Sequence, residues 1–548
     1  EYDYRNQLIR KEEPYREQSA KITKYSYDKK GNLLSETVLN QGKESTTSYV
    51  YDGLGRAIAQ VSPTGGISTN IYDEMDNLVK QILPAYYGKP SETAPGIVYE
   101  YDALNRMYRV TAFNGSTGQV LTYREYDAIG NVVKDVDGAG YKAADPKASI
   151  GASYEYDVYG NVITYISAQT AADNNSNGTK YHTQKTVYDG LGRAVSQKDA
   201  YGNETISSYY MNGKLKEKVY PDGSSESFSY DLTGKVEEVR TDKASNKTRV
   251  YNNIFDKPYR IEYPNNAIET YVYSNTGNLI ESTDTAGNTS YYGYTPAGDM
   301  ADKKEFVKSE NRYDWFRLTR RTYDESGNML SSETFEYGKP KQSGQDEVLI
   351  SAGDRTDYEY DRAGRLIKVT GPQGRETLNQ YDINGSLVKQ MQKVDGAGYD
   401  IRRYTYDFRQ QMTGEAVLVK AEDILAEYHA GAVPDSEYAN MLVCMTTYEY
   451  YSTGKLKNRK DAAGNTTAFE YDYDGRVTRK TDPLTKNTVY SYDMAGNLKQ
   501  EKNARGFTSA YDYDSMNRLI RKTAPAADGS DAVMRYVYDI MGNLTKQI

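Results

Sequence analysis

The chain has 548 residues, a formal net charge of −9 and a pI near 5.2, so its composition excludes the positive footprint of a nucleic-acid-binding protein. With 26% charged and only 38% hydrophobic residues the sequence leans towards disorder, but its 57 tyrosines exclude an ordinary disordered chain. One cysteine, Cys444, excludes an internal disulfide, and no apolar run approaches membrane-spanning length. Such a tyrosine excess is typical of β-strands, where the ring packs and the hydroxyl stays wet.

A repeated phrase, Tyr-Asp-x-x-Gly-Asn-Leu, begins near the N-terminus and runs to the C-terminus. We count 22 copies, most often 21 residues apart. Their tyrosines are residues 2, 27, 51, 72, 101, 126, 156, 188, 209, 230, 251, 273, 294, 323, 360, 381, 406, 450, 471, 492, 513 and 538. Because Glu1 falls inside a copy, we expect the chain to be an internal piece of a longer protein.

Each copy predicts two turns. The first follows the tyrosine directly, and the second lies about ten residues later, as in DTAGN at 284–288. Aspartate at the first position of a turn and glycine at the fourth indicate a type I turn closed by a residue with positive φ. The fourth position of the first turn is glycine in 16 copies and Asn6, Asp76, Asn105 or Asn517 in four; only Phe255 and Gln410 depart from the rule.

We therefore assign a structural role in the repeat to the tyrosine, the aspartate and the turn glycine. The residues concerned are Tyr27, Asp28, Gly31, Tyr51, Asp52, Gly55, Tyr126, Asp127, Gly130, Tyr156, Asp157, Gly160, Tyr188, Asp189, Gly192, Tyr230, Asp231, Gly234, Tyr323, Asp324, Gly327, Tyr360, Asp361, Gly364, Tyr492, Asp493, Gly496, Tyr538, Asp539 and Gly542.

The segments between turns are about six residues long and alternate with a period of two, as in TKNTVYSYD at 485–493. This alternation predicts two strands per copy, and hence an all-β protein in which residues 1–548 form one array of about 44 strands. At about 4.8 Å per strand the ribbon is roughly 210 Å long, and its twist must curl it. We expect one continuous curled antiparallel sheet, a hollow spiral shell or open barrel making about one turn, roughly 65 Å across.

The array is interrupted at five places. We predict loops at residues 84–96, 137–153 and 167–182, and a charged, glycine-rich decoration of a hairpin loop at residues 331–356. The longest interruption, residues 415–443, has the composition of one or two short helices.

The YDxxGN and DxxGN turns resemble those of the RHS/YD-repeat family, which includes bacterial RHS toxins, wall-associated proteins of bacilli, the B and C components of insecticidal toxin complexes, and teneurins. The resemblance covers essentially the whole chain. It implies a hollow β-shell, which in the toxins encloses a C-terminal effector. The Asp-Pro-x-Gly cleavage element of the toxins has no match here, since Asp145-Pro146 and Asp482-Pro483 lead into other residues. Autoproteolysis is therefore not carried over to this chain.

Candidate chemical groups are few, and each has a plainer interpretation. His182 and His429 have no serine or cysteine motif beside them, and a buried inert thiol is favoured for Cys444. Asp173, Asn175 and Asn177 partly match a calcium loop, but the twelfth position is Gln184, which lacks the carboxylate of a calcium loop, so an ordinary loop is favoured. We expect no enzyme activity, no cofactor and no metal.

Two functions fit these observations. The first is a structural shell or scaffold of a bacterial secreted or cell-wall protein, whose partners are other segments of its own polypeptide, such as a C-terminal effector. The second is a surface adhesin that binds carbohydrate or a protein partner through exposed tyrosines. Neither reading involves nucleic acid or insertion into a membrane.

Overall fold

The computed structural model describes residues 1–16, 19–40, 42–177, 183–230, 237–310, 313–340, 348–349, 353–393, 399–418, 442–526 and 530–548. These residues form 44 strands, one α-helix and three short 3-10 helices, so the predicted all-β fold is confirmed. No helix in the described part of the chain is long and apolar enough to cross a membrane.

The chain divides into two compact units, each built from two separate stretches. Unit 1 comprises residues 1–96 and 250–445, and unit 2 comprises residues 97–249 and 446–548. We call the two stretches of a unit its early and late segments.

The elements up to residue 249 are β1 (Arg10–Arg16), β2 (Ser19–Tyr27), β3 (Leu33–Asn40), β4 (Lys43–Tyr51), β5 (Ala57–Val61), β6 (Ile67–Tyr72), β7 (Leu78–Ile82), η1 (Pro84–Tyr86), β8 (Gly96–Tyr101), β9 (Met107–Phe113), β10 (Gly118–Tyr126), β11 (Val132–Asp137), η2 (Pro146–Ala148), β12 (Ala152–Tyr156), β13 (Val162–Ile166), α1 (Ala168–Asn177), β14 (Gln184–Tyr188), β15 (Ala194–Asp199), β16 (Glu204–Tyr209), β17 (Leu215–Val219), β18 (Ser225–Tyr230), β19 (Glu237–Thr241) and β20 (Lys247–Asn252).

The remaining elements are β21 (Pro258–Glu262), β22 (Ile268–Tyr273), β23 (Leu279–Thr283), β24 (Thr289–Tyr294), β25 (Met300–Glu310), β26 (Tyr313–Tyr323), β27 (Met329–Pro340), β28 (Val348–Leu349), β29 (Asp354–Tyr360), β30 (Leu366–Thr370), η3 (Pro372–Gly374), β31 (Glu376–Tyr381), β32 (Leu387–Lys393), β33 (Tyr399–Tyr406), β34 (Met412–Leu418), β35 (Leu442–Tyr450), β36 (Leu456–Lys460), β37 (Thr466–Tyr471), β38 (Val477–Thr481), β39 (Asn487–Tyr492), β40 (Leu498–Lys502), β41 (Thr508–Tyr513), β42 (Leu519–Pro525), β43 (Asp531–Tyr538) and β44 (Leu544–Gln547).

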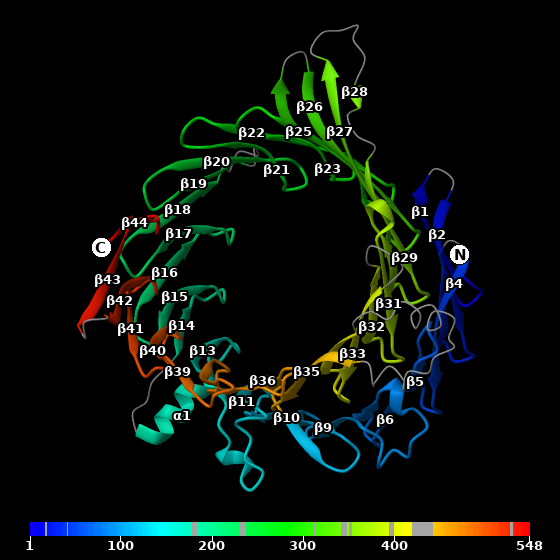
Figure 1. Cartoon of the computed structure of the whole chain (residues 1–548), viewed down its shortest axis with the longest axis horizontal. Coiled ribbons are helices and arrows are strands. Elements are labelled where there is room, and N and C mark those ends of the chain that lie inside the picture. Colours follow the sequence, from blue (N-terminus) through cyan, green and yellow to red (C-terminus); the bar gives the residue numbers. More distant parts are fainter. Residues whose placement is uncertain are drawn as a thin grey trace. The chain divides into compact units, whose positions relative to one another are not determined.

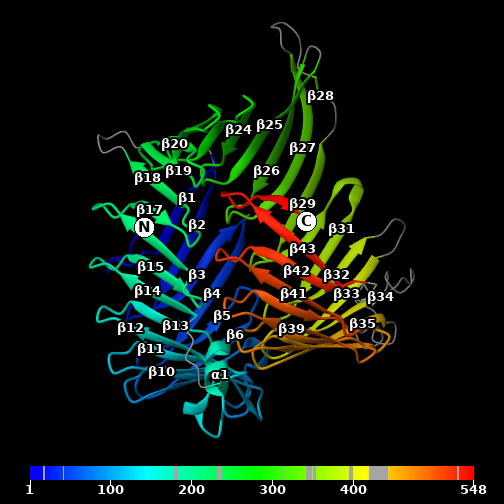
Figure 2. The ribbon, with the colours of Figure 1, turned by 90° about the vertical axis from the view of Figure 1, so that its left-hand side faces the viewer.

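In the described part of the chain the strands pair antiparallel, mostly with their neighbours in sequence, and form a sheet of hairpins; β27 pairs with both β28 and β29. Figure 2 shows β39, β41, β42 and β43 following one another across the late segment of unit 2. The register shifts by one residue at the motif tyrosine, for example between Ser491 and Tyr492 where β39 pairs with β40. This shift is the bulge that the Asp-x-x-Gly turn predicts.

The sheet has little dry interior. Among the described residues only eight hydrophobic side chains are buried, and these are Ile82, Ala94, Ala112, Tyr123, Val136, Met391, Ile401 and Ala416. Most strand residues are half-buried instead, as expected for a sheet whose two faces both carry polar and aromatic side chains. The apolar area that the sheet buries is therefore spread over many half-buried side chains rather than gathered in a dry core.

At three of the interruptions the structure differs from the one predicted from the sequence. Residues 167–182 were expected to form a loop, but residues 168–177 form helix α1 (Figure 1), whose Ala-rich start suits a helix. Part of the expected decoration at 331–356 continues strand β27. Of the expected helical insertion at 415–443, residues 415–418 and 442–443 belong to strands β34 and β35, and residues 419–441 lie outside the described part.

The continuation of β27 belongs to an enlarged hairpin group. Strands β25, β26 and β27 have 11, 11 and 12 residues, whereas most other strands have five or six. Across them runs an aromatic row, in which the ring centroids of Phe306 and Phe316 are 5.8 Å apart and those of Phe316 and Tyr337 are 5.7 Å apart. Such cross-strand ring pairs stabilise the extra length.

Candidate functional site: the repeat turns and the edges of the sheet

The aspartate of the repeat organises the first turn through its two carboxylate oxygens. In Asp52, Oδ1 accepts hydrogen bonds from the backbone N–H groups of Leu54 (2.9 Å) and Arg56 (3.0 Å), and Oδ2 accepts one from Arg56 Nε (2.7 Å). The hydrogen bond from the Arg56 backbone is the main cause that lowers the pKa of Asp52 below its usual value. The same pattern, with asparagine in place of arginine, surrounds Asp28 and Asp157.

The fourth turn position has positive φ, as the sequence predicts. Gly496 has φ 92°, and Asn6, Asp76, Asn105 and Asn517 have φ between 59° and 67°. Gln410, one of the two expected exceptions, also has positive φ, at 62°.

The prediction that Phe255 occupies the fourth turn position, as the other exception to the rule, is wrong. The turn at that copy is shifted by one residue, because strand β20 extends to Asn252, and the residue with positive φ (56°) is Asp256. Its amide donates to the carbonyl of Asn253, so Asn253 takes the place of the turn aspartate. The rule therefore holds at this copy once the register is corrected.

The motif tyrosine connects its own repeat to the preceding one. The Tyr51 hydroxyl donates to the backbone carbonyl of Leu33 at 2.9 Å, and Leu33 is the strand residue that follows the preceding turn. In the described part of the chain at least sixteen motif tyrosines make the equivalent bond, over 2.6–3.1 Å: Tyr27, Tyr51, Tyr72, Tyr126, Tyr156, Tyr188, Tyr209, Tyr273, Tyr323, Tyr360, Tyr381, Tyr406, Tyr471, Tyr492, Tyr513 and Tyr538. We call this series the tyrosine ladder. It explains why the repeat requires tyrosine rather than phenylalanine.

Arginine after the turn glycine or asparagine adds a second connection, to the following repeat. Arg106 Nη1 donates to the carbonyl of Asp127 (2.8 Å), and its guanidinium carbon lies 4.7 Å from the ring centroid of Tyr126. Arg193 does the same to Tyr210 and Tyr209. The tyrosine of each such repeat is thus held on the ring by an arginine and at the hydroxyl by a carbonyl.

Some residues singled out from the sequence lie outside the described part of the chain, and others lie in a different element from the one predicted. Asp231 and Gly234 of the Tyr230 copy, and both histidines, lie outside the described residues, as does the side chain of Cys444. Asp173, Asn175 and Asn177 lie on helix α1 rather than in a loop, and Asp173 accepts a hydrogen bond from Gln169 Nε2 at 2.9 Å. Among the described residues, no group of three or more His, Cys, Asp or Glu side chains could hold a metal ion.

Because the two turns of a repeat lie at opposite ends of its strands, each segment has two edges. The first-turn edge carries the Tyr-Asp turns, and the second-turn edge carries the other turns and their insertions. In both units the first-turn edge of the late segment packs against the second-turn edge of the early segment. These junctions could not be predicted from the sequence, since about 300 residues separate the partners.

In unit 2 the junction is built from hydrogen bonds and one ion pair at successive hairpins. Asp474, in the turn after Tyr471, accepts from Ser167 Oγ (2.9 Å) and from the backbone N–H of Gln169 (2.9 Å) at the start of helix α1. At the next hairpin along, the hydroxyl of Tyr201 accepts from the backbone N–H of Met494 (3.3 Å). One hairpin further, Arg518 Nη2 lies 3.9 Å from a carboxylate oxygen of Asp222.

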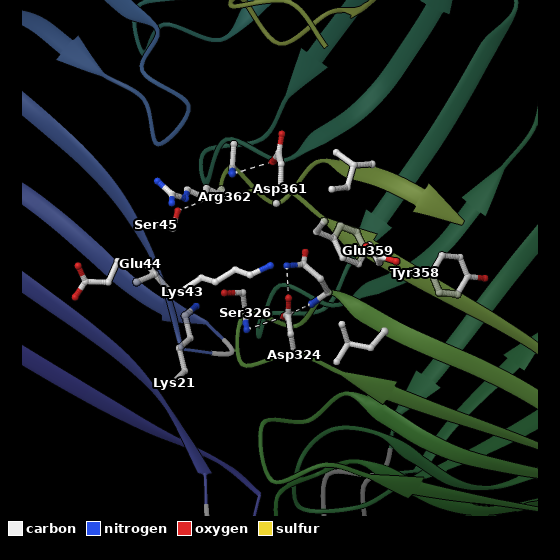
Figure 3. Close-up of a pocket in the computed structure, with 17 residues that line it drawn as sticks. Lys21, Lys43, Glu44, Ser45, Asp324, Ser326, Tyr358, Glu359, Asp361 and Arg362 are labelled. Carbon is white, nitrogen blue, oxygen red and sulfur yellow. Dashed lines mark hydrogen bonds between the residues drawn. The ribbon is translucent and has the colours of Figure 1, made fainter. Parts of the chain in front are cut away.

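In unit 1 the same arrangement borders a partly open polar cavity of about 600 Å³. Ser45 donates to the backbone carbonyl of Arg362, and Lys43 extends across the cavity towards the turn that holds Asp324 (Figure 3). At the next hairpin, Asn384 Oδ1 accepts from the backbone N–H of Ala85 at 3.0 Å. The cavity wall mixes lysine with carboxylates, so it is a wet seam between edges rather than a selective anion site.

Comparisons with known proteins are consistent with the repeat identified in the sequence. The RHS repeat family model matches residues 350–376, 450–486, 471–508 and 492–530. The double-stranded DNA deaminase toxin A of Burkholderia cenocepacia (strain H111) is 23% identical over 371 residues, which are 56% of this chain and 25% of the toxin. The chain thus matches about a quarter of that toxin's length.

One solved structure with a TM-score above 0.5 shares the arrangement of strands. The crystal structure of TcdB2-TccC3-Cdc42 is 14% identical with a TM-score of 0.52, covering 98% of this chain and 31% of the other. The Photorhabdus luminescens Tc holotoxin pore with mutation TccC3-D651A is 13% identical with a TM-score of 0.46, covering 96% of this chain and 31% of the other. Residues 350–376 and 450–530 match RHS repeats, and the resemblance to the RHS/YD-repeat family is confirmed.

Proposed function

We propose that this RHS-repeat chain is a structural wall segment of a bacterial secreted or cell-wall protein, and that it has no catalytic role of its own. The observation that carries the proposal is the tyrosine ladder, which uses the most frequent side chain to connect one repeat to the next. The repeated aspartates could serve as acid–base groups by their chemistry, but their carboxylates accept the hydrogen bonds of the turns instead. The residues that define the repeat are thus occupied in building the sheet.

The wall encloses or presents another part of the same full-length polypeptide, a toxin-type effector. Support comes from the RHS repeat match and from a curated relative that is named a toxin. The half-buried polar and aromatic faces of the sheet suit a wall that is wet on both sides.

Small-angle scattering of the 61.8 kDa chain tests the shell. A hollow wall gives a radius of gyration clearly above the roughly 24 Å expected for a compact globule of this length. A compact solid profile would contradict the proposal. Intact mass after long incubation tests the absence of self-cleavage, since a discrete shorter product would reveal a catalytic site in the segment.

The second candidate is an adhesin that binds carbohydrate, and the aromatic row on β25–β27 is the observation that favours it. Trp315 lies on β26 beside this row, and its ring covers Gly338, where an added Cβ would come within 2.7 Å of the indole. Because Trp315 is the single tryptophan, its fluorescence reports on this hairpin group alone. Titration with bacterial cell-wall glycan fragments that leaves the emission unchanged would remove this candidate.

A further inference from the structure

The first-turn edge of the early segment of unit 2 is apolar and uncovered. Five consecutive repeats carry at the tip of the first turn a side chain that is largely exposed: Leu104 (68%), Ile129 (78%), Tyr159 (82%), Leu191 (73%) and Met211 (99%). The row is regular, because the strands that carry it pair in sequence. Exposed apolar side chains that follow one another along an edge indicate an interaction surface rather than scattered surface residues.

The late segment of the same unit shows what such an edge contacts. Its first-turn tips include Met494 and Met516, and both are half-buried at the junction with the early segment. Met494 lines a pocket together with Thr170 of α1, and Met516 lines another together with Tyr220 and Pro221, so both tips face the second-turn edge. In this fold, apolar first-turn tips become covered when a second-turn edge of another ribbon lies against them.

The late segment has a second-turn edge of its own, and that edge is open. Leu484, at the tip of the turn 482–485, is 74% exposed, and Phe507, beside the turn 503–506, is 53% exposed. The alanines of the preceding second turn, Ala462 and Ala463, are exposed too. Unit 2 therefore presents one uncovered edge of each kind, and the two kinds are the partners found at its internal junction.

We propose that a second copy of this chain binds head to tail, with its late second-turn edge (Leu484, Phe507) against the early first-turn edge (Leu104 to Met211) of the first copy. Along both edges the turns recur once per hairpin, that is, every two strands of about 4.8 Å each. The turns of one edge can therefore fit between the turns of the other at successive repeats. The contact repeats the internal junction between separate molecules. Such a heterologous contact leaves a free edge at each end, and association is open-ended.

Light scattering across a concentration series tests the proposal. The native chain should exceed 61.8 kDa increasingly with concentration. The double variant Leu191→Asp/Met211→Asp and the double variant Leu484→Asp/Phe507→Asp should each weaken association by about tenfold or more, as expected for charges placed in an apolar contact. Val187→Asp, a charge on strand β14 at a residue 50% exposed, is the matched control and should leave association unchanged.

Mixing the two double variants separates this arrangement from others. Each retains one intact edge, and the intact edges are complementary, so the mixture should form dimers and nothing larger. A native chain that stays monomeric overturns the proposal. So does a Leu484→Asp/Phe507→Asp variant that associates normally, because contact would then join two first-turn edges. Circular dichroism confirms that each variant retains its sheet, so lost association is not lost folding.

Discussion

Asp474 accepts a hydrogen bond from the hydroxyl of Ser167 at 2.9 Å, although 307 residues separate them. The second carboxylate oxygen accepts from the backbone N–H of Gln169, one of the unpaired amides in the first turn of helix α1. Ser167 itself precedes the helix and accepts from the backbone N–H of Thr170 at 3.3 Å. A turn of the late segment thus caps a helix of the early one.

Asp474→Ala should remove this cap and expose the junction. We expect the helix start to lose about 1 kcal/mol of stability, the usual cost of a lost N-terminal cap. Hydrogen exchange of the amides of residues 168–171 measures it, and their protection should fall while that of distant strands is unchanged. Asn175→Ala, at an exposed position of the same helix, is the control. Equal loss of protection in both variants would show that the Asp474 contact does not hold the helix.

Tyr492→Phe should weaken the tyrosine ladder at one step. The substitution removes the hydroxyl that donates to the half-buried carbonyl of Val477 at 2.9 Å, and the expected cost is about 1 kcal/mol. Tyr490 lies two residues away on the same face of β39, and its hydroxyl has no hydrogen bond among the described residues, so Tyr490→Phe is the matched control. Urea denaturation compares the two midpoints. A control that loses as much as Tyr492→Phe would contradict the ladder.

Thr485→Gly should stabilise the protein. Thr485 is a β-branched residue at φ 61°, in the left-handed region that favours glycine. Relief of this strain should exceed the entropic cost of glycine and give a gain of about 1 kcal/mol. The opposite change, Gly496→Val at φ 92°, should cost about 1–3 kcal/mol. Thermal unfolding of the pair should show shifts of opposite sign, and a lower Tm for Thr485→Gly would refute the strain.

Alkaline pH should unfold the chain through its tyrosines. Burial raises the pKa of Tyr492, and the same cause raises the pKa of Tyr360 and Tyr513. Unfolded tyrosine ionises near pH 10, so this contribution to stability is fully present below about pH 10 and is lost as pH rises through the higher folded pKa. Tyrosinate absorbance and circular dichroism, followed together, should change in one step above pH 10. Complete ionisation of the tyrosines while the sheet is retained would contradict this prediction.

Turn chemistry and strand alternation were predictable from sequence because both are local. The Asp-x-x-Gly spacing alone predicted positive φ at Gly496 and a bulge at Tyr492, and both are present. The failure at Phe255 was also local, since Asn252 and Asn253 are equally good first residues of a turn and only strand pairing selects Asn253. The ladder partner of Tyr51 could not be predicted, because pairing sets which carbonyl its hydroxyl reaches.

The contacts between edges were decided only by the tertiary structure. Asp474 and Met494 look like any other turn residues, and nothing in their neighbourhood identifies partners some 300 residues away. Which early turn meets which late turn depends on small twists accumulated over dozens of strands, and no short sequence pattern encodes that sum. The same applies to the exposed row from Leu104 to Met211, since the motif permits any residue at a turn tip and only the packing of the two segments decides which tips are covered.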